Sequence, residues 1–409
     1  MSESVSNPLA ESGKPLFFRV AGPARPGIHA PPNRLGEAVR VCVRSLSLMQ
    51  KEALVVAASS GAVWRLASDE GAYLAGLDEA PCPLSFLTTG MVSSYMNEIQ
   101  ALARLRGIDI RAIRLIQDNY YTMTGSARAG TMTGGAKDVH LAAQIASSAG
   151  PDELRSLVAE ATVASPLNGL LRGAMPSLFT LTHNGVEIPT GAAAALGAAA
   201  VPDPTDAFES ATPAPGDWAA LVRRGPKTPK AAHTVTLAND SLTDEQNRLL
   251  HVRGICTLRE DGVKQIEQQL FNPHGSVFHF LCDEAHESGG RGLAPDAASY
   301  ISAGIGFCFM TQFGRYAKIV AKDLRDYRIV QDTHFSLGGA SGGTGAAGRA
   351  ESVETHVYLD TGEDDDFAQT ALAMAEQTCF LHALCRTDLK TKVSVQDWTH
   401  DVESPAAVG

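Results

Sequence analysis

The chain carries one sequence pattern twice, and this internal repeat limits its possible folds more than any other feature. Residues 33–181 align with residues 247–395 without a gap, at a constant offset of 214 residues. Matching positions include Asn33-Arg34-Leu35 and Asn247-Arg248-Leu249, Cys42 and Cys256, Asp69-Glu70 and Asp283-Glu284, and Gln117-Asp118 and Gln331-Asp332. Self-similarity at one fixed distance indicates that a single structural unit was duplicated and fused. We call residues 33–181 the first copy and residues 247–395 the second copy.

The two copies differ in their thiol content. Serine occupies three positions of the first copy where the second copy has cysteine. The pairs are Ser68 and Cys282, Ser94 and Cys308, and Ser165 and Cys379. Serine fills similar space but has no thiol redox chemistry. The second copy therefore carries the chemistry that the first copy lacks.

The repeat divides the chain of 409 residues into segments, and this length suits two domains. We expect an irregular N-terminal arm (1–32), a first repeat domain (33–185), a linker (186–246), a second repeat domain (247–397) and a tail (398–409). The linker is dominated by Ala, Pro and Thr, a composition that buries too little apolar surface for a domain. We expect it to be partly ordered at most.

Hydrophobic periodicity predicts the same order of elements in each copy. In the second copy, strands are expected at 253–259, 264–270, 276–283, 328–337, 352–359 and 391–395, and helices at 297–322 and 366–385. The Gly-rich segment 338–345 joins two strands and no helix follows it, so we interpret it as a hairpin loop and not as a phosphate site. Strands and helices without βαβ alternation indicate an α+β fold.

Charge and composition narrow the function classes. The net charge is −11 and the pI is about 5.6, which argues against nucleic acid or an anionic membrane as a partner. No apolar run is long enough for a membrane span, and the N-terminus lacks the features of a signal peptide. We therefore expect a cytoplasmic protein, in which the seven cysteines are reduced and are catalytic or buried.

Two cysteines of the second copy lie on predicted helices. Cys308 follows Gly304 and Gly306, and because glycine costs roughly 1 kcal/mol in a helix interior, these glycines indicate very close packing of a helix or a substrate. Cys379 shares the apolar face of the other helix, so its side chain is expected to point into the core. The residues of that face are Ala368, Ala371, Leu372, Ala375 and Cys379. Two inward cysteines on packed helices are expected to meet.

The Gly-x-Gly-Phe-Cys-Phe segment that ends at Phe309, the Ala-Glu-x-Thr-Cys segment that ends at Cys379, and the α+β order resemble the OsmC/Ohr family of thiol peroxidases. The resemblance implies two OsmC-like folds, with strands wrapped around two central helices, that form a pseudo-dimer within one chain. It implies that Cys308 reduces an organic hydroperoxide and that Cys379 resolves the resulting sulfenic acid as a disulfide. An external dithiol would then reduce the disulfide, and no metal or organic cofactor is expected. Further homo-oligomerisation stays open.

Three family features have only loose counterparts in this chain. The family keeps a Glu at the start of the cysteine helix, where this chain has Asp296. It also uses an Arg from the early strands to stabilise the thiolate, and Arg259 is the nearest match. The family's Cys-Pro pair is replaced by Cys379-Phe380. Two alternatives therefore remain: Cys308 as a non-redox nucleophile in thioester or C–S bond chemistry, and a small apolar ligand bound at the pseudo-dimer interface.

Other candidate sites have weaker patterns. His279, His334 and His356 lie on predicted strands without the spacing of a zinc site. His382 lies one helical turn after Cys379 and is expected at the surface. Ser94 has no Gly-x-Ser-x-Gly elbow, so we interpret it as the remnant of a lost thiol site.

Overall fold

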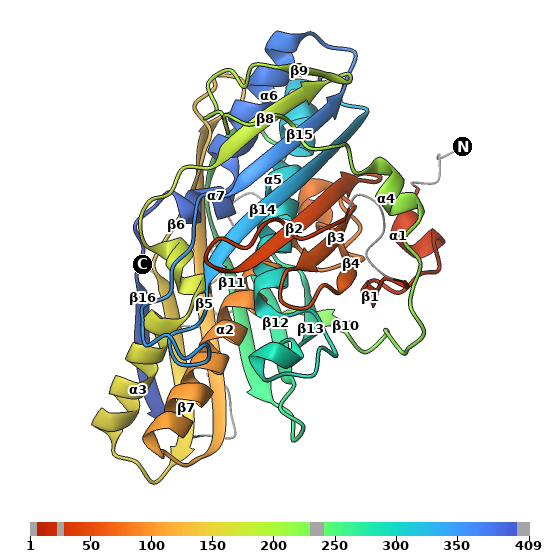
Figure 1. The fold of residues 1–409 in the computed structure, drawn as a ribbon. Coiled ribbons are helices and arrows are strands. Elements are labelled where there is room, and N and C mark those ends of the chain that lie inside the picture. The colour runs from red at the N-terminus through yellow and green to blue at the C-terminus, as the bar shows by residue number, and fades with distance from the viewer. Residues whose placement is uncertain (1–5, 23–27, 230–240, 399–409) are drawn as a thin grey trace.

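The computed structural model describes residues 6–22, 28–229 and 241–398. The chain forms two large sheets with helices between and beside them (Figure 1). The first sheet has the strand order β1-β4-β3-β2-β14-β15-β8-β9, and the second has the order β10-β13-β12-β11-β5-β7-β16, with β6 paired to β5. This mixture of sheets and helices confirms the predicted α+β class.

The elements of the two copies recur at the offset of the sequence repeat. The first copy contains β2 (Gly36–Ser45), β3 (Lys51–Ala57), β4 (Val63–Ser68), α2 (Pro83–Arg106), β5 (Ile110–Ser126), β6 (Thr133–Ala136), β7 (Val139–Ser147), α3 (Pro151–Ala164) and β8 (Leu178–His183). The second copy contains β11 (Glu245–Leu258), β12 (Lys264–Asn272), β13 (Ser276–Cys282), α5 (Ala297–Val320), β14 (Asp326–Ser336), β15 (Glu354–Asp360), α6 (Asp365–Thr378), α7 (Phe380–Cys385) and β16 (Thr391–Asp397). Helices α2 and α5 correspond end to end, and so do α3 and α6.

Each sheet is built from strands of both copies. Strand β2 of the first copy pairs with β14 of the second, and Cys42 lies opposite Val330. At the equivalent place in the other sheet, β11 pairs with β5, and Cys256 lies opposite Leu115. Strands β8 and β16 extend the sheets as parallel partners of β15 and β7. Because the sheets are shared, the copies are intertwined and bury one common core.

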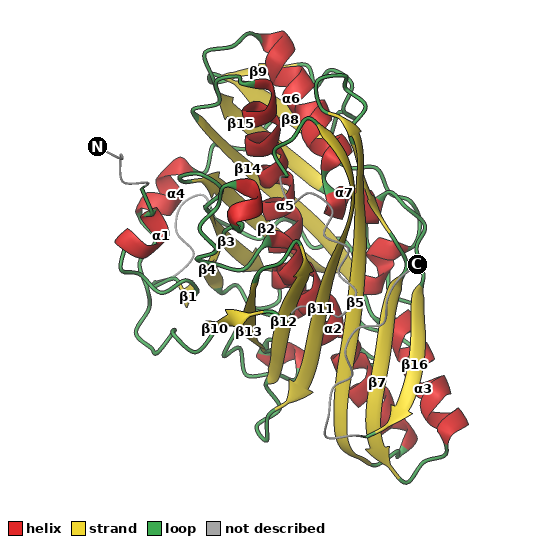
Figure 2. Ribbon diagram, turned by 180° about the vertical axis from the view of Figure 1, so that it is seen from behind, coloured by secondary structure: helices red, strands yellow, loops and turns green. Residues whose placement is uncertain are grey.

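Helices α2 and α5 form the layer between the two sheets. Helix α5 packs on β2, β3 and β14, and α2 packs on β11, β12 and β5; Figure 2 shows the second sheet from behind, with the helices beyond it. The two helices approach closely where each has a glycine. A Cβ on Gly304 would lie 2.8 Å from the Leu87 amide nitrogen, and one on Gly90 would lie 2.6 Å from the Ala297 carbonyl oxygen. The close packing predicted from Gly304 is therefore a helix–helix contact.

The N-terminal arm reaches the centre of the molecule. It contains the short elements α1 (Pro8–Glu11) and β1 (Phe18–Arg19), and β1 pairs with β4. Phe17 is fully buried and contacts the rings of Phe86, Phe280 and Tyr300, which come from both copies. The arm thus packs into the common core, although its sequence predicts no regular structure.

The described parts of the predicted linker, residues 186–229 and 241–246, contain more regular structure than expected. It contains β9 (Val186–Ile188), α4 (Thr205–Glu209) and β10 (Val222–Lys227), and β10 adds a strand to the second sheet through β13. Phe208 of α4 is buried in a cluster with Cys42 and Val330, on the outer side of the first sheet. The low apolar content that argues against a domain does not prevent the segment from packing on an existing surface.

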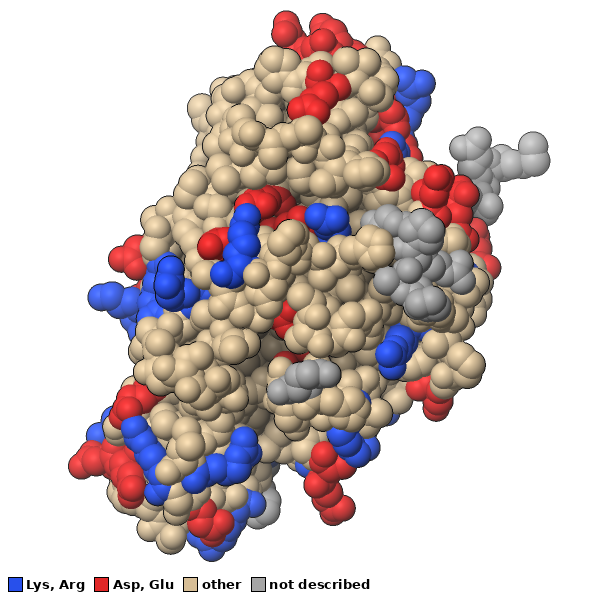
Figure 3. Space-filling model, viewed as in Figure 1, with Lys and Arg blue, Asp and Glu red and all other residues tan. Residues whose placement is uncertain are grey.

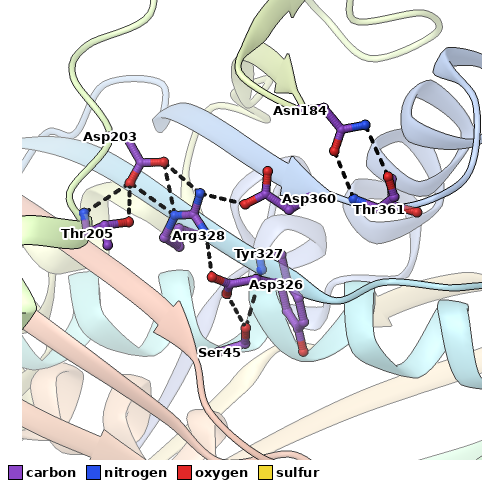
Figure 4. A network of polar contacts seen from close by, with 9 residues as sticks. All are labelled: Ser45, Asn184, Asp203, Thr205, Asp326, Tyr327, Arg328, Asp360 and Thr361. Carbon is purple, nitrogen blue, oxygen red and sulfur yellow. Dashed lines mark hydrogen bonds and ion pairs between the residues drawn. The ribbon is translucent and has the colours of Figure 1, made fainter.

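A cluster of charges fixes this segment to the first sheet (Figure 4). The Arg328 guanidinium on β14 donates to both carboxylate oxygens of Asp203, with the shortest N–O distance at 2.7 Å. It also donates to Asp326 at 2.6 Å and to Asp360 at 2.8 Å. Hydrogen bonds from Arg328 and Thr205 hold the pKa of Asp203 below its ordinary value, against the effect of its partial burial. Asp203 is thereby held to a strand more than a hundred residues away in sequence.

Replacing Arg328 by methionine is expected to lower the free energy of unfolding by about 2 kcal/mol, because three carboxylates lose their shared donor. Urea denaturation of the wild type and the variant measures this difference. Arg325→Met is the matched control, since the Arg325 side chain is 63% exposed and pairs with a single carboxylate among the described residues, Asp323 at 3.1 Å. This control is expected to change stability by less than about 0.5 kcal/mol. Equal effects of the two substitutions would contradict a structural role for the Arg328 cluster.

No helix in the described part of the chain is long and apolar enough to cross a membrane. On the face drawn in Figure 3, basic and acidic side chains lie in small groups of mixed sign. The acidic residues 363–366 form the start of a helix. Helix α6 begins at Asp365, and the Asp364 side chain caps it by accepting from the Phe367 amide at 2.9 Å. The C-terminal tail from residue 399 lies outside the described residues.

Candidate active site

Cys308 and Cys379 lie in the common core, where α5 packs against α6 and α7. Cys308 is on α5, and Cys379 lies between α6 and α7. Cys308 lies about three turns into α5 and is 2% exposed, and Cys379 is fully buried. The single helix predicted over 366–385 is wrong at this point. Cys379 has an extended backbone, with φ −69° and ψ 119°, and separates α6 from α7. Its sulfur caps α7 by accepting from the His382 amide at 3.5 Å, so the cysteine stays on the inner face.

The Cys308 and Cys379 side chains lie close enough to interact, and this interaction raises the pKa of the Cys308 thiol. The first copy shows the same arrangement with oxygen in place of sulfur, because the Ser94 and Ser165 hydroxyls are 2.7 Å apart. Ser165 also caps the following turn by accepting from the Asn168 amide at 3.4 Å, as Cys379 does from His382. The duplication has therefore preserved the same pair of neighbouring positions, with hydroxyls in the first copy and thiols in the second.

The first copy covers the thiol pair of the second. Strand β6 lies over the break between α6 and α7, and a Cβ on Gly134 would lie 2.5 Å from the Thr378 carbonyl oxygen. The Gln377 side chain donates to the Met132 carbonyl at 2.7 Å and holds this strand in place. At the twin position, Gly348 lies directly over Ser165. Both glycines are required for close backbone contact, and both shield the residue beneath from solvent.

A small cavity of about 30 Å³ adjoins Cys308. Its polar wall includes Glu70, Thr311 and Arg315, and its lining comes from both copies. The apolar part of the wall is formed by Leu74, Leu84, Leu250, Leu270, Pro273 and Phe380. A space of this size holds about one water molecule or the head of a small ligand. The cavity gives the Cys308 sulfur a polar neighbourhood within an apolar core.

The acidic group of this cavity comes from the first copy. Glu70 follows β4, and its carboxylate accepts from the Tyr73 hydroxyl at 2.5 Å and from the Thr311 hydroxyl at 3.3 Å. Thr311 lies one helical turn after Cys308. Burial raises the pKa of Glu70, while the Lys51 ammonium and the two hydroxyl donors oppose that rise. Glu70 also interacts electrostatically with Cys308.

Cationic side chains from both copies lie near the thiol. Lys51 of the first copy is 1% exposed, and burial lowers its pKa to about 8, although Glu70 and Cys308 act in the opposite direction. Arg315, on α5 two turns after Cys308, is 2% exposed, and burial lowers its pKa to about 9. Its Nε donates to the Ser241 carbonyl at 2.7 Å, while Nη2 has no hydrogen-bond partner among the described residues. Arg315 therefore has a free donor group at the cavity wall.

Burial raises the pKa of the Cys308 thiol well above its ordinary value, and contact with Cys379 raises it further. His382 does not offset this effect. It is fully buried beside the Phe309 ring, at a centroid distance of 4.8 Å, and not at the surface as predicted. Burial lowers the pKa of His382 to about 3, so the imidazole is neutral at neutral pH. Among the described residues, the cations placed nearest to Cys308 are Lys51, Arg315 and Arg248, which also lines the cavity.

The two loose family counterparts lie away from the thiols. Arg259 pairs with Asp261 at 2.9 Å in the turn between β11 and β12, and its side chain is 43% exposed. It does not line the Cys308 cavity, so its position does not match the predicted role in stabilising a thiolate. Asp296 caps α5 by accepting from the Ser299 amide at 2.6 Å, and it faces the serine pair of the first copy.

The residues around the serine pair of the first copy repeat the arrangement around the thiol pair of the second. Glu284 matches Glu70 and accepts from Asn97 at 2.8 Å, one helical turn after Ser94, as Glu70 accepts from Thr311. Glu284 also pairs with Lys264 at 3.2 Å. These groups line an open cleft of about 470 Å³, much larger than the cavity at Cys308. The fold therefore builds two related sites, each with a Glu from the opposite copy.

Asp296 in this cleft is expected to make stability depend on pH. Burial and the Glu284 carboxylate raise the pKa of Asp296 to about 7. A carboxyl with a raised pKa stabilises the fold while it is protonated, and this contribution is lost as pH rises through 7. Asp296→Asn keeps the capping oxygen and cannot ionise. We expect its gain in unfolding free energy over wild type to be larger at pH 8 than at pH 5 by about 1–3 kcal/mol.

Chemical denaturation at the two pH values measures this effect. Asp364→Asn is the matched control, because Asp364 caps α6 in the same way but is exposed. Its effect on stability should be the same at both pH values. A gain for Asp296→Asn that does not grow between pH 5 and pH 8 would contradict the proposed cost of the buried charge.

The fold and the site define a duplicated α+β protein in which two entwined copies enclose a buried dithiol. Residues 289–394 match the family model of OsmC-like protein, so the second copy carries an OsmC-like domain. That match includes Cys308 and Cys379. Searches of curated proteins and of solved structures returned no match. Within the described residues, His, Cys, Asp and Glu side chains form no cluster of three or more suited to a metal ion.

Proposed function

We propose that the protein is a thiol peroxidase that reduces organic hydroperoxides with Cys308 as the reacting thiol and Cys379 as the resolving thiol. The contact between the two thiols is the observation that carries this proposal. A sulfenic acid at Cys308 would form next to the thiol that must condense with it. The OsmC-like family of the second copy includes peroxidases, which supports the same chemistry.

The reaction balances with two thiols and one hydroperoxide. The Cys308 thiolate attacks the O–O bond, one oxygen transfers to sulfur, and the other leaves as an alcohol after it gains a proton. The Cys379 thiol then condenses with the sulfenic acid, which forms the disulfide and releases water. An external dithiol reduces the disulfide and restores both thiols. No metal or organic cofactor takes part.

The cavity residues have matching roles in this proposal. Glu70 is the group placed to take the Cys308 proton and to return it to the leaving oxygen. Arg315 has a free N–H donor at the cavity wall for the peroxide oxygens, and Lys51 supplies positive charge. The apolar wall favours a hydroperoxide with a hydrocarbon group over hydrogen peroxide. The small volume requires the wall to open when the substrate enters.

Stoichiometric oxidation tests the proposal. One equivalent of cumene hydroperoxide is added to the reduced protein, and peptides are mapped by mass spectrometry without reduction. We expect a disulfide between Cys308 and Cys379, formation of the alcohol in equal amount, and catalytic turnover when dithiothreitol is present. Unchanged thiols after exposure to the hydroperoxide would reject the peroxidase.

The same experiment separates the two alternatives. A non-redox nucleophile at Cys308 would require Cys308 for its reaction but would give no disulfide and would tolerate loss of Cys379. A binding protein for a small apolar ligand would keep its function with serine at both positions. Formation of the disulfide with equal yield of alcohol distinguishes the peroxidase from both.

A further inference from the structure

We infer that Cys82 of the first copy is a second resolving cysteine, able to form a disulfide with Cys308 from the opposite side of the cavity. This inference rests on the proposed function, because it requires a sulfenic acid at Cys308. The repeat pairs Cys82 with Asp296, so no symmetry in the sequence indicates a thiol here. Only the fold brings it to the site.

Close packing of α2 and α5 places the two residues together. Cys82 directly precedes Pro83, the first residue of α2, and Cys308 follows Gly304 by one helical turn. A Cβ on Gly304 would lie 3.1 Å from the Pro83 carbonyl oxygen, so the start of α2 lies against this turn of α5. Cys82 and Cys308 both line the cavity of about 30 Å³.

The two cysteines also share their neighbours. Glu70 interacts electrostatically with both Cys82 and Cys308. The Tyr121 ring, which is fully buried, lies close enough to interact with Cys82, Cys308 and Cys379. The Cys82 sulfur lies 3.4 Å from the Ser85 hydroxyl in the first turn of α2. Burial and the Glu70 carboxylate raise the pKa of Cys82 to about 12, so the resolving step must remove the Cys82 proton as the S–S bond forms.

The step balances without another reactant. The Cys82 sulfur attacks the sulfur of the Cys308 sulfenic acid, an S–S bond forms, and the S–O bond breaks. The hydroxyl leaves as water with the proton that Cys82 gives up. Cys82 would therefore protect Cys308 from further oxidation when Cys379 is absent or already oxidised. Its location in the first copy makes the first copy a participant in the redox cycle.

The Cys379→Ser variant tests the inference. After one equivalent of cumene hydroperoxide, we expect a Cys82–Cys308 disulfide in the peptide map and the loss of two titratable thiols. In Cys82→Ser/Cys379→Ser, the sulfenic acid should persist, and dimedone labelling of Cys308 should rise several-fold over the single variant. Cys385→Ser/Cys379→Ser is the matched control, because Cys385 is also buried near residue 379, and it should still form the Cys82–Cys308 disulfide.

The outcomes separate this inference from the proposed function. A dimedone-labelled Cys308 in Cys379→Ser, without a disulfide to Cys82, would overturn the role of Cys82 and leave the peroxidase intact. A Cys308 that does not react with hydroperoxide in the wild type would overturn the peroxidase itself. Should Cys379→Ser fail to fold, the wild type oxidised with excess hydroperoxide provides the second measurement, and absence of any Cys82–Cys308 peptide there would also overturn the inference.

Discussion

Cys308→Ser is expected to reduce hydroperoxide consumption to the uncatalysed rate of dithiol and buffer. A serine hydroxyl at this position cannot be oxidised, and the first copy shows that the fold accepts it, because Ser94 occupies the equivalent place with its hydroxyl 2.7 Å from Ser165. The loss should therefore come from chemistry and not from unfolding. Consumption of cumene hydroperoxide in the presence of dithiothreitol measures the rate, and circular dichroism confirms the fold.

Ser94→Ala is the matched control for this experiment. It changes the same position of the other copy, removes one hydroxyl from a buried pair and leaves the thiol site untouched. We expect its rate of hydroperoxide consumption to equal that of the wild type within about twofold, with a loss of stability near 1 kcal/mol. A Cys308→Ser variant that keeps a substantial rate would exclude Cys308 as the reacting thiol.

Gly304→Ala is expected to destabilise the fold by about 3 kcal/mol. The new methyl group would lie 2.8 Å from the Leu87 amide nitrogen and 3.1 Å from both the Pro83 carbonyl and the Phe86 Cβ. Two of these atoms belong to the backbone of α2, so the helices must separate to relieve the overlap. In an exposed helix, the same substitution would stabilise by up to about 1 kcal/mol. The expected effect therefore has the opposite sign to helix propensity.

Urea denaturation measures this change, and Gly306→Ala is the control within the same helix. A Cβ on Gly306 would meet mainly the ends of side chains, Val43 Cγ2 at 3.1 Å and Gln331 Oε1 at 3.5 Å. Those groups can shift, so we expect a change within about 1 kcal/mol. Equal stability of Gly304→Ala and Gly306→Ala would contradict the tight crossing of α2 and α5.

Most elements of the second copy could be predicted from hydrophobic periodicity. The helix expected at 297–322 corresponds to α5 (Ala297–Val320), and the strand expected at 264–270 lies within β12 (Lys264–Asn272). The helix over 366–385 was predicted as continuous because its inward face continues past Cys379. Hydrophobic periodicity indicates which side chains face the core. It cannot reveal a one-residue break in a helix when the residues on both sides of the break keep the same buried face.

The candidate site could be predicted only in part. Both thiols were singled out because serine replaces them in the other copy, and the inward direction that helical spacing predicts for them agrees with their burial. Glu70, Lys51 and Cys82 were missed because they belong to the first copy, more than two hundred residues before Cys308. The shared motif Asp69-Glu70 and Asp283-Glu284 was the available signal, since it marks a carboxylate that both copies retain. Arg259 was chosen by its distance in sequence, and its side chain faces solvent.

The sequence by itself determined the duplication, the α+β class, the order of elements and the position of the thiols in one copy. These features follow from local sequence patterns, and the repeat presents each pattern in two copies. Only the tertiary structure decided that the copies exchange strands, since β2 pairs with β14 and β11 pairs with β5. Pairing between distant strands depends on complementary surfaces in space and not on neighbouring residues. That arrangement brings the Glu70 carboxylate and the Lys51 ammonium of the first copy to the thiols of the second.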